Sequence, residues 1–548
     1  MMLSWPIPPS FYSAFLLSTF LFCTPVGADH LRELQTKAIS EGTVAWGYWG
    51  PDPAKYAGWT NHSNRLIPAY TFGIDLSAFC GERTIYRDAA RLAELYGRVP
   101  ADTLDPQAVY FDQTDIARLQ RAAVAAGKKN VILIVFDGMD WQTTRAAAIY
   151  NSGKVGYREG RGTGLDFLDY RGVSTDFGYF VSSPYSAELT VDINAQTVLV
   201  GDDRLMGGYC ARHGGLSPWT AGDDPGYLIA KMRECQHAVT DSAASATSLC
   251  AGIKTYNDSV NVDPQGRQVR TVAHELQEKG MAIGVVTSVP ISHATPACAY
   301  AHNVWRDDFQ DLTRDLLGIP SIAHRTQPLA GVDVLLGAGW GVSVEADSKQ
   351  GANFVPGNKY ITDKDLERID ASRGGHYVVV QRQTGVNGPR ALREAAAAAA
   401  SQKRRLFGFF GAATAHLPFA TADGGYDPAI GVKRLAEAYT RADLDENPTL
   451  ADMSQAALDV LSTNKAGFWL MIESGDVDWA NHDDNIDNSI GAVLSGDAAF
   501  RTVIAWIEAH KSWDNTAVIL TADHGHYLNL VDPAALISPA PTSPSGNP

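Results

Sequence analysis

Seven short, largely apolar runs recur along the chain and form its strongest pattern. They cover residues 130–136, 282–286, 332–336, 377–380, 406–410, 468–472 and 516–520. Continuous apolar runs of this length are typical of parallel strands that are covered on both faces. Helical patterns lie between them, at residues 271–278, 391–402, 449–461 and 498–510. Strands that alternate with helices predict an α/β fold with an open, doubly wound, mostly parallel central sheet flanked by helices.

Side chains that can bind metal ions follow four of the predicted strands. In chain order they are Asp137, then His293 with Thr295, then Glu473, and finally Asp523 with His524. Ligands of such sheets bind in the crevice beyond the carboxyl ends of the strands, where loops from several strands meet. We therefore expect these side chains to lie together at one edge of the sheet.

The two ends of the chain differ from this central part. Residues 11–23 form a short apolar run followed by small residues, so residues 1–28 are predicted to be a signal peptide for export to the periplasm or the extracellular space. Residues 29–128 are expected to be an N-terminal extension without visible chemistry, and the Pro- and Ser-rich residues 539–548 a disordered tail. No later run is apolar for long enough to span a membrane, so the mature chain is predicted to have no membrane span.

Composition and charge narrow the class of protein. The chain has 548 residues, of which 45% are hydrophobic and 19% charged, enough for a large core. Its 45 Lys and Arg against 61 Asp and Glu give a net charge of −16, which argues against a nucleic-acid-binding surface. Six cysteines without a CxxC pair indicate neither a disulfide scaffold nor a zinc ribbon, and they leave any disulfide pairing open.

Carboxylate and imidazole side chains indicate which metal ions the predicted edge of the sheet could bind. Asp478 and His482 are four residues apart, so on a helix they share one face and can bind a single cation. Carboxylate and imidazole ligands without thiolates suit a catalytic zinc site with an open position. The oxygen ligands of Asp137, Thr295 and Glu473 are the kind that magnesium prefers.

Residues 240–247, Thr-Asp-Ser-Ala-Ala-Ser-Ala-Thr, have the small side chains expected at the start of a tightly packed helix. Asp241 or Ser242 can cap such a helix, whose N-terminal amides favour an anion. A serine beside a metal ion can lose its proton and act as a nucleophile, which makes Ser242 the candidate. Each of these patterns taken alone is more often a simple turn or helix cap, and it is their combination that indicates a site.

Five motifs in this order, VILIVFDGM, VTDSAASAT, SHATPACAYAH, ESGDVDWANH and TADHGH, resemble the active-site motifs of the alkaline phosphatase family. The resemblance implies an alkaline-phosphatase-like three-layer fold with a catalytic domain at residues 129–538. It also implies hydrolysis of phosphate monoesters through a phosphoserine, with two zinc ions and one magnesium ion as cofactors. Many members of the family are dimers, so a homodimer is an expectation too.

The resemblance implies a role for each matching residue. Asp478 and His482 match ligands of the first zinc, and Asp137, Asp523 and His524 match those of the second zinc, which activates Ser242. The magnesium ligands of the family are matched by Asp137, Thr295 and Glu473, with His293 beside them. Arg306 matches the arginine that binds two phosphate oxygens, and Trp479 matches a position that contacts the substrate.

One family feature has no match in the expected place. In the family a third histidine, downstream of the Asp-His pair, completes the first zinc site. Here only His526 follows His524, and it matches a histidine outside the ligand set. The sequence therefore predicts either a catalytic domain that lacks its C-terminal part, with a first zinc site of two ligands, or a first zinc site that is completed differently. Two alternatives stay open: another hydrolase of the same superfamily, such as a phosphodiesterase, or a degenerate, non-catalytic protein that binds phosphate or metal.

Overall fold

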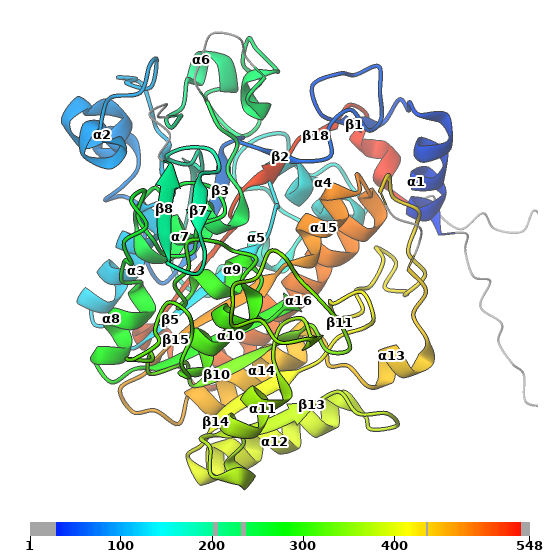
Figure 1. Ribbon diagram of the computed structural model, residues 1–548. Helices are drawn as coiled ribbons and strands as arrows, with labels where there is room; N and C mark the ends of the chain where they lie inside the picture. The colour runs from blue at the N-terminus through cyan, green and yellow to red at the C-terminus, as the bar shows by residue number, and fades with distance from the viewer. Residues whose placement is uncertain (1–28, 201–205, 232–236, 434–436, 539–548) are drawn as a thin grey trace, which may run out of the picture.

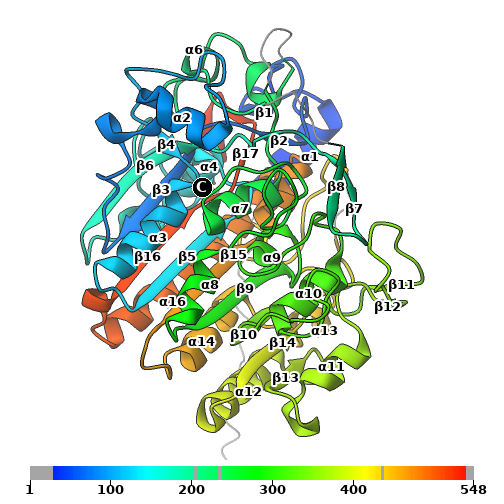
Figure 2. The same ribbon diagram turned by 60° about the vertical axis from the view of Figure 1, so that its left-hand side comes forward.

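The computed structural model describes residues 29–200, 206–231, 237–433 and 437–538 (Figure 1). The predicted signal peptide, residues 1–28, and the predicted tail, residues 539–548, lie outside the described residues. In the described part, helices enclose one large sheet (Figures 1 and 2).

The central sheet has ten strands in the order β13-β14-β10-β9-β15-β5-β16-β3-β6-β4. Their bounds, in that order, are Tyr377–Gln381, Arg405–Phe409, Val334–Ala338, Ala282–Pro290, Phe468–Ser474, Asn130–Phe136, Thr516–Thr521, Ile67–Phe72, Thr175–Val181 and Phe111–Asp112. Neighbours are parallel from β13 to β16, and β3 is antiparallel to both β16 and β6. The seven predicted strands and the mostly parallel sheet are confirmed.

Helices cover both faces of this sheet (Figures 1 and 2). One layer contains α3 (Asp115–Ala125), α7 (Ser242–Ala251), α8 (Val272–Glu278), α9 (Ala294–Cys298) and α10 (Phe309–Leu317). The other contains α4 (Trp141–Ser152), α12 (Gly388–Gln402), α14 (Leu450–Leu461), α15 (Asp476–His482) and α16 (Ile486–Ala509). The four helices expected between the strands are present as α8, α12, α14 and α16, and the three-layer α/β architecture is confirmed.

Shorter elements lie around this core. The helices are α1 (His30–Glu41), α2 (Ala89–Tyr96), α5 (Asp166–Asp169), α6 (Ala211–Gly214), α11 (Asp363–Ile369) and α13 (Arg441–Asp445). The strands form four two-stranded sheets: β1 (Gly47–Trp49) with β18 (Leu528–Leu530), β2 (His62–Ser63) with β17 (Gly525–His526), β7 (Thr190–Asp192) with β8 (Thr197–Val200), and β11 (Ser343–Val344) with β12 (Gly357–Asn358).

Helix α16 differs from its prediction in length and in character. It begins at Ile486 rather than at residue 498, and by length and composition alone it is long and apolar enough to cross a membrane. Most of it is buried inside the protein, where it packs against α14, α15 and α4. An apolar helix that is buried on most sides is typical of a large protein core.

The N-terminal segment is not the separate extension that its sequence predicts. All six residues of β3 are buried, and the strand lies inside the central sheet between β16 and β6. Strands β1 and β2 of the same segment pair with β18 and β17 near the C-terminal end of the described chain. Residues 29–128 are therefore part of the fold that carries the site.

Candidate metal centre

The four strand ends that carry predicted ligands are brought together because β9, β15, β5 and β16 are consecutive in the sheet. Asp137 follows β5, Glu473 lies near the end of β15, and Asp523 follows β16. His293 and Thr295 follow β9 at the start of α9. Parallel strands in adjacent positions deliver their carboxyl ends to one edge, so the predicted residues converge there.

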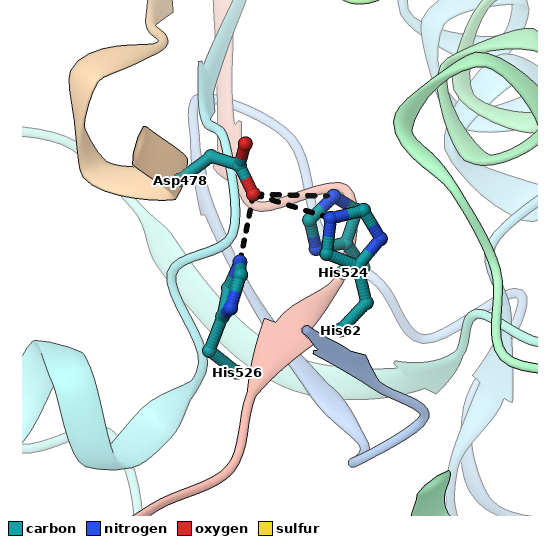
Figure 3. A group of neighbouring side chains, drawn as sticks. All are labelled: His62, Asp478, His524 and His526. Atoms are coloured by element: carbon teal, nitrogen blue, oxygen red, sulfur yellow. Dashed lines mark hydrogen bonds and ion pairs between the residues drawn. The ribbon is translucent and has the colours of Figure 1, made fainter. Parts of the chain in front are cut away.

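A first cluster surrounds the carboxylate of Asp478 (Figure 3). Its Oδ1 lies 2.7 Å from Nε2 of His526, 3.3 Å from Nε2 of His62 and 3.5 Å from Nε2 of His482. Burial lowers the pKa of both His482 and His526, so their neutral forms are favoured.

The tautomers of two of these histidines are set by the backbone. Nδ1 of His62 lies 2.9 Å from the carbonyl oxygen of Thr240, and Nδ1 of His482 lies 2.8 Å from that of Thr60. A carbonyl oxygen can only accept, so in each neutral ring Nδ1 carries the proton and Nε2 has a free lone pair. The two Nε2 atoms are only 3.0 Å apart. Two lone pairs at this distance repel unless a cation lies between them, so the cluster fits a metal ion.

His62 is the residue that the sequence analysis missed. It lies in β2, just before β3, and because β3 is antiparallel to β16, the start of β3 lies at the carboxyl end of β16. Pairing of β2 with β17 then places His62 opposite His526. The first cluster therefore has a further imidazole within reach, supplied from upstream in the chain, in addition to the two ligands expected from the sequence. A histidine shortly before an apolar run was the only available signal.

A second cluster consists of Asp137, Asp523 and His524, whose ligand atoms all lie within 4.8 Å of one another. All three side chains are fully buried. Nε2 of His524 is 3.2 Å from Oδ1 of Asp137 and 3.4 Å from Oδ2 of Asp523. Burial, together with the charge of Asp523, raises the pKa of Asp137 well above its usual range. Two buried carboxylates beside an imidazole form a ligand set that fits a second divalent cation.

Ser242 is the first residue of α7 and lies beside this second cluster. Its Oγ is 3.1 Å from Nε2 of His524. Asp241 caps the helix by accepting a hydrogen bond from the backbone N–H of Ala244, which fixes where the helix begins. The hydroxyl of Ser242 thus lies beside side chains that can bind a metal ion and at the positive end of the helix dipole.

Arg306 reaches the same place from the segment before α10. Its Nη1 donates a hydrogen bond of 2.9 Å to Oδ2 of Asp241, and its Nη2 lies 3.5 Å from Nε2 of His293. The Arg306 guanidinium therefore stands next to the start of α7, held by the carboxylate that caps the helix. A planar guanidinium in this position can bind two oxygens of an anion.

A third cluster contains Asp137, His293 and Glu473. Thr295 donates a hydrogen bond from Oγ1 to Oδ2 of Asp137 over 3.4 Å, and Glu473 accepts one from Thr287. Burial raises the pKa of Glu473 to about 8, with the charge of Asp523 adding to the effect of burial. Oδ1 of Asp137 and Oε1 of Glu473 have no hydrogen-bond partner among the described residues. Such orphaned buried carboxylate oxygens fit a hard cation such as magnesium.

Trp479 lies between two imidazoles near these clusters. Its ring is edge-on to that of His293, with centroids 5.9 Å apart, and to that of His416, at 5.1 Å. Residue 479 comes directly after Asp478 on α15, so its side chain borders the metal centre. All the site residues predicted from the sequence are thus brought into one region by the fold.

Residues 220–538 match the family model described as alkaline phosphatase. Among curated proteins, alkaline phosphatase 4 of Bacillus subtilis is 30% identical over 303 residues, covering 55% of this chain and 50% of that protein. The alkaline phosphatase of Escherichia coli is 29% identical over 312 residues, covering 56% of this chain and 62% of that protein. The chain thus spans about half of the first relative and less than two thirds of the second.

Solved structures with detectable similarity include a cold-active alkaline phosphatase from Shewanella sp., with 21% identity, a TM-score of 0.42 and coverage of 72% of this chain and 68% of that one. The alkaline phosphatase of Thermus thermophilus has 21% identity and a TM-score of 0.43, with coverage of 73% and 60%. The family assignment rests on the sequence matches. The family match leaves out residues 1–219 and with them His62 and Asp137.

Proposed function

The chain belongs to the alkaline phosphatase family, and on that premise we propose that it is a metal-dependent hydrolase of phosphate monoesters with Ser242 as its nucleophile. The observation that supports the proposal is the close approach of the Nε2 atoms of His62 and His482, 3.0 Å apart beside Asp478, while backbone carbonyl oxygens contact Nδ1 of both rings. Such an arrangement fits a bound metal cation. A cation next to a serine at a helix N-terminus supports chemistry on an anionic ester.

The proposed metal ligands fall into three sets. His62, Asp478 and His482 would hold one zinc ion; Asp137, Asp523 and His524 a second; and Asp137, Thr295 and Glu473 a magnesium ion, with His293 next to it. Sets that contain imidazole together with carboxylate suit zinc, and all-oxygen sets suit magnesium. When bound, the ions supply positive charge that offsets the phosphate dianion, favours the ionised serine and stabilises the departing alcohol.

Different residues of the chain then bind the phosphate group and attack its phosphorus atom. The phosphate group binds at the start of α7, where the Arg306 guanidinium and the helix amides contact its oxygens. Oγ of Ser242 attacks phosphorus, the ester oxygen leaves on the opposite side, and the phosphoryl group is carried as a phosphoserine. Water then cleaves the phosphoserine, which restores the Ser242 hydroxyl and releases inorganic phosphate.

His526 and Trp479 have supporting parts in this proposal. Nε2 of His526 contacts Oδ1 of Asp478 at 2.7 Å, so it orients that carboxylate. Trp479 borders the substrate region and narrows it. Export to the periplasm or the extracellular space and a homodimeric assembly also stay proposals, as does the limit of the catalytic domain at residue 538.

The proposal is tested with Ser242→Ala and with Ser248→Ala as a matched control. Ser248 is a buried serine on the same helix, and its hydroxyl only donates to backbone carbonyls. We expect Ser242→Ala to lower kcat/KM for an aryl phosphate by at least about a thousandfold, with metal content unchanged, while Ser248→Ala keeps most of the activity. Undiminished turnover by Ser242→Ala would refute the nucleophile.

Two further measurements address the alternatives. Faster hydrolysis of a bis(aryl) phosphate diester than of the monoester would favour a phosphodiesterase. A wild-type chain that is loaded with zinc and magnesium but shows no turnover on either ester would favour a non-catalytic binding protein.

A further inference from the structure

A second group of metal-type side chains lies outside the centre described above. It consists of His302, Asp315 and His324, whose ligand atoms all lie within 4.8 Å of one another. His302 lies in the segment between α9 and α10, Asp315 lies on α10, and His324 lies in the loop that follows (Figure 1). Nδ1 of His302 is 3.1 Å from Nε2 of His324, and that Nε2 is 3.7 Å from Oδ2 of Asp315.

The backbone sets the tautomer of His302. Its Nε2 lies 2.8 Å from the carbonyl oxygen of Val269, which can only accept, so Nε2 carries the proton of the neutral ring. Nδ1 therefore directs a lone pair at His324. The ring is buried, and on its other face it is stacked on His274 at 5.1 Å, nearly parallel. This is the arrangement in which a carbonyl group fixes a metal-binding histidine through its second nitrogen.

Asp315 adds a buried carboxyl group to this cluster. The side chain is fully buried, and its Oδ1 has no hydrogen-bond partner among the described residues. Its Oδ2 accepts a hydrogen bond from the backbone N–H of His302. In the described part of the chain, the only ion-pair partner of Asp315 is His324. Removing a carboxylate from water without a cation is costly, so the position favours a bound cation.

We propose that His302, Asp315 and His324 bind one zinc-type divalent transition-metal ion at a structural site separate from the catalytic centre. Ligand distances of about 2.0–2.1 Å in a tetrahedral site correspond to ligand atoms about 3.3 Å apart. The observed separations of 3.1 and 3.7 Å lie on either side of that value. Two nitrogens and one oxygen supply three positions, and water can fill the fourth because the side chain of His324 is 13% exposed.

A metal ion bound at this site would link three segments of the chain. His302 is four residues before Arg306, Asp315 is near the end of α10, and His324 belongs to the loop between α10 and β10. An ion bound by all three restrains the segment that presents Arg306, without contact with the substrate. The inference concerns residues outside the three catalytic clusters, so it stands or falls independently of the proposed phosphatase activity.

The first test counts the metal ions bound by the full chain after dialysis against metal-free buffer. We expect His324→Asn to retain one zinc ion fewer per chain than the wild type and to lose part of the rise in Tm that added zinc produces. The matched control His376→Asn replaces an exposed histidine that belongs to none of the clusters, and it should behave as the wild type. Equal zinc counts in all three proteins would overturn the proposal.

A second test covers the case in which His324→Asn does not fold. The double variant Asp137→Ala/Asp478→Ala removes ligands from the catalytic clusters and leaves His302, Asp315 and His324 in place. It should still retain one zinc ion per chain, released by a chelator together with a drop in Tm. Retention of no zinc would show that the three side chains form only a hydrogen-bonded ion pair, and would refute the site.

Discussion

At the scale of single residues, the candidate metal centre combines histidines held by backbone carbonyl oxygens with buried carboxylate oxygens that accept no hydrogen bond in the described part of the chain. His62 and His482 use Nδ1 on backbone carbonyls and direct Nε2 at Asp478. By contrast, Oδ1 of Asp137 and Oε1 of Glu473 are buried without a hydrogen bond in the described part of the chain. Imidazole nitrogens and buried carboxylate oxygens gathered in this way form an arrangement that a bound cation would stabilise.

The role of His62 can be tested by His62→Ala. Loss of one imidazole should weaken zinc binding at least about tenfold and reduce kcat/KM at limiting zinc, and excess zinc should restore part of the activity. Zinc titration followed by calorimetry and by hydrolysis of an aryl phosphate measures both effects. His376→Ala, at an exposed position, is the control. Unchanged zinc affinity in His62→Ala, with reduced affinity in His482→Ala, would show that His62 is not a ligand.

A different buried histidine predicts a pH dependence of stability. Burial lowers the pKa of His237 to about 3, while its ring stacks on Tyr227 at 4.2 Å and contacts Asn64. The unfolded chain, with an ordinary histidine pKa of about 6.5, binds more protons than the folded chain between these two values. Stability from this group is therefore complete above pH 6.5 and is lost as the pH falls towards 3.

We expect the free energy of unfolding of the wild type to fall between pH 7 and pH 5 by about 2 kcal/mol more than that of His237→Gln, which keeps an acceptor for Asn64. Urea titrations of both proteins at the two pH values give the difference. An equal loss in the two proteins would mean that His237 titrates normally in the folded state.

At the scale of elements, the turn after β5 places the site with little freedom. Gly138 has φ +71°, and a Cβ atom there would lie 2.8 Å from Cδ2 of His526 and 3.1 Å from Cα of Asp478. Its backbone N–H donates to Oδ1 of Asp523 over 3.0 Å. Asp140, two residues on, caps α4 by accepting from the backbone N–H groups of residues 142 and 143. Residues 137–140 therefore supply the proposed ligand Asp137, the closely packed Gly138 and the cap of α4, Asp140.

Gly138→Ala should damage both stability and the metal centre. A left-handed alanine costs about 1 kcal/mol, and the contact with His526 adds to this and displaces Asp478 from its ligand position. Gly153→Ala is a matched control, because Gly153 has φ +65° at the end of α4 but no atom within 4 Å of the added Cβ. It should lose about 1 kcal/mol in denaturant titration and keep full activity. Equal activity of the two variants would contradict the close packing around Gly138.

Strand β3 connects the N-terminal segment to the candidate site. Its antiparallel direction delivers His62 to the edge of the sheet where the parallel strands end. The same segment supplies the Thr60 carbonyl to His482, and the amide of Gln113 donates to the backbone carbonyl of Asp523. Residues 29–128 thus contribute one proposed ligand and orient two others.

At the scale of the whole molecule, the central sheet joins segments that are far apart in the chain. Strand β16 pairs with β5 on one side and with β3 on the other, so the two ends of the described chain meet in the middle of the fold. Helix α16, which packs against α14, α15 and α4, completes the core beneath them. The metal centre therefore depends on the entire sheet rather than on the catalytic motifs alone.

Removal of residues 29–128 tests this dependence. A chain that begins at residue 129 should expose the edge of β16, aggregate, and fail to bind zinc at Asp478, whereas a reference chain that begins at residue 29 stays folded. Supplying residues 29–128 as a separate chain in the same cell should recover soluble, zinc-binding protein. The shortened chain is compared by gel filtration and metal content, and a soluble, fully zinc-loaded chain from residue 129 would refute the claim.

Much of this protein was determined by sequence alone because the signals are local. Buried parallel strands appear as uninterrupted apolar runs, and each ligand that follows such a run, as Asp137 follows β5, comes with its strand. Helix α7 and its cap Asp241 are local in the same way. The sheet, the helices between its strands and the gathering of the ligands at one edge could therefore be predicted.

Only the tertiary structure decided which partner completes the first cluster. His62 is 416 residues before Asp478 in the chain, as the numbering of the two shows, and no periodic pattern links them. Their contact depends on β3 pairing antiparallel with β16 and on β2 pairing with β17, which are long-range choices of strand order and direction. A motif records which side chains a short segment carries, whereas sheet pairing decides which distant segment arrives beside it. For that reason the sequence motifs do not point to His62, whereas the fold places its imidazole beside Asp478.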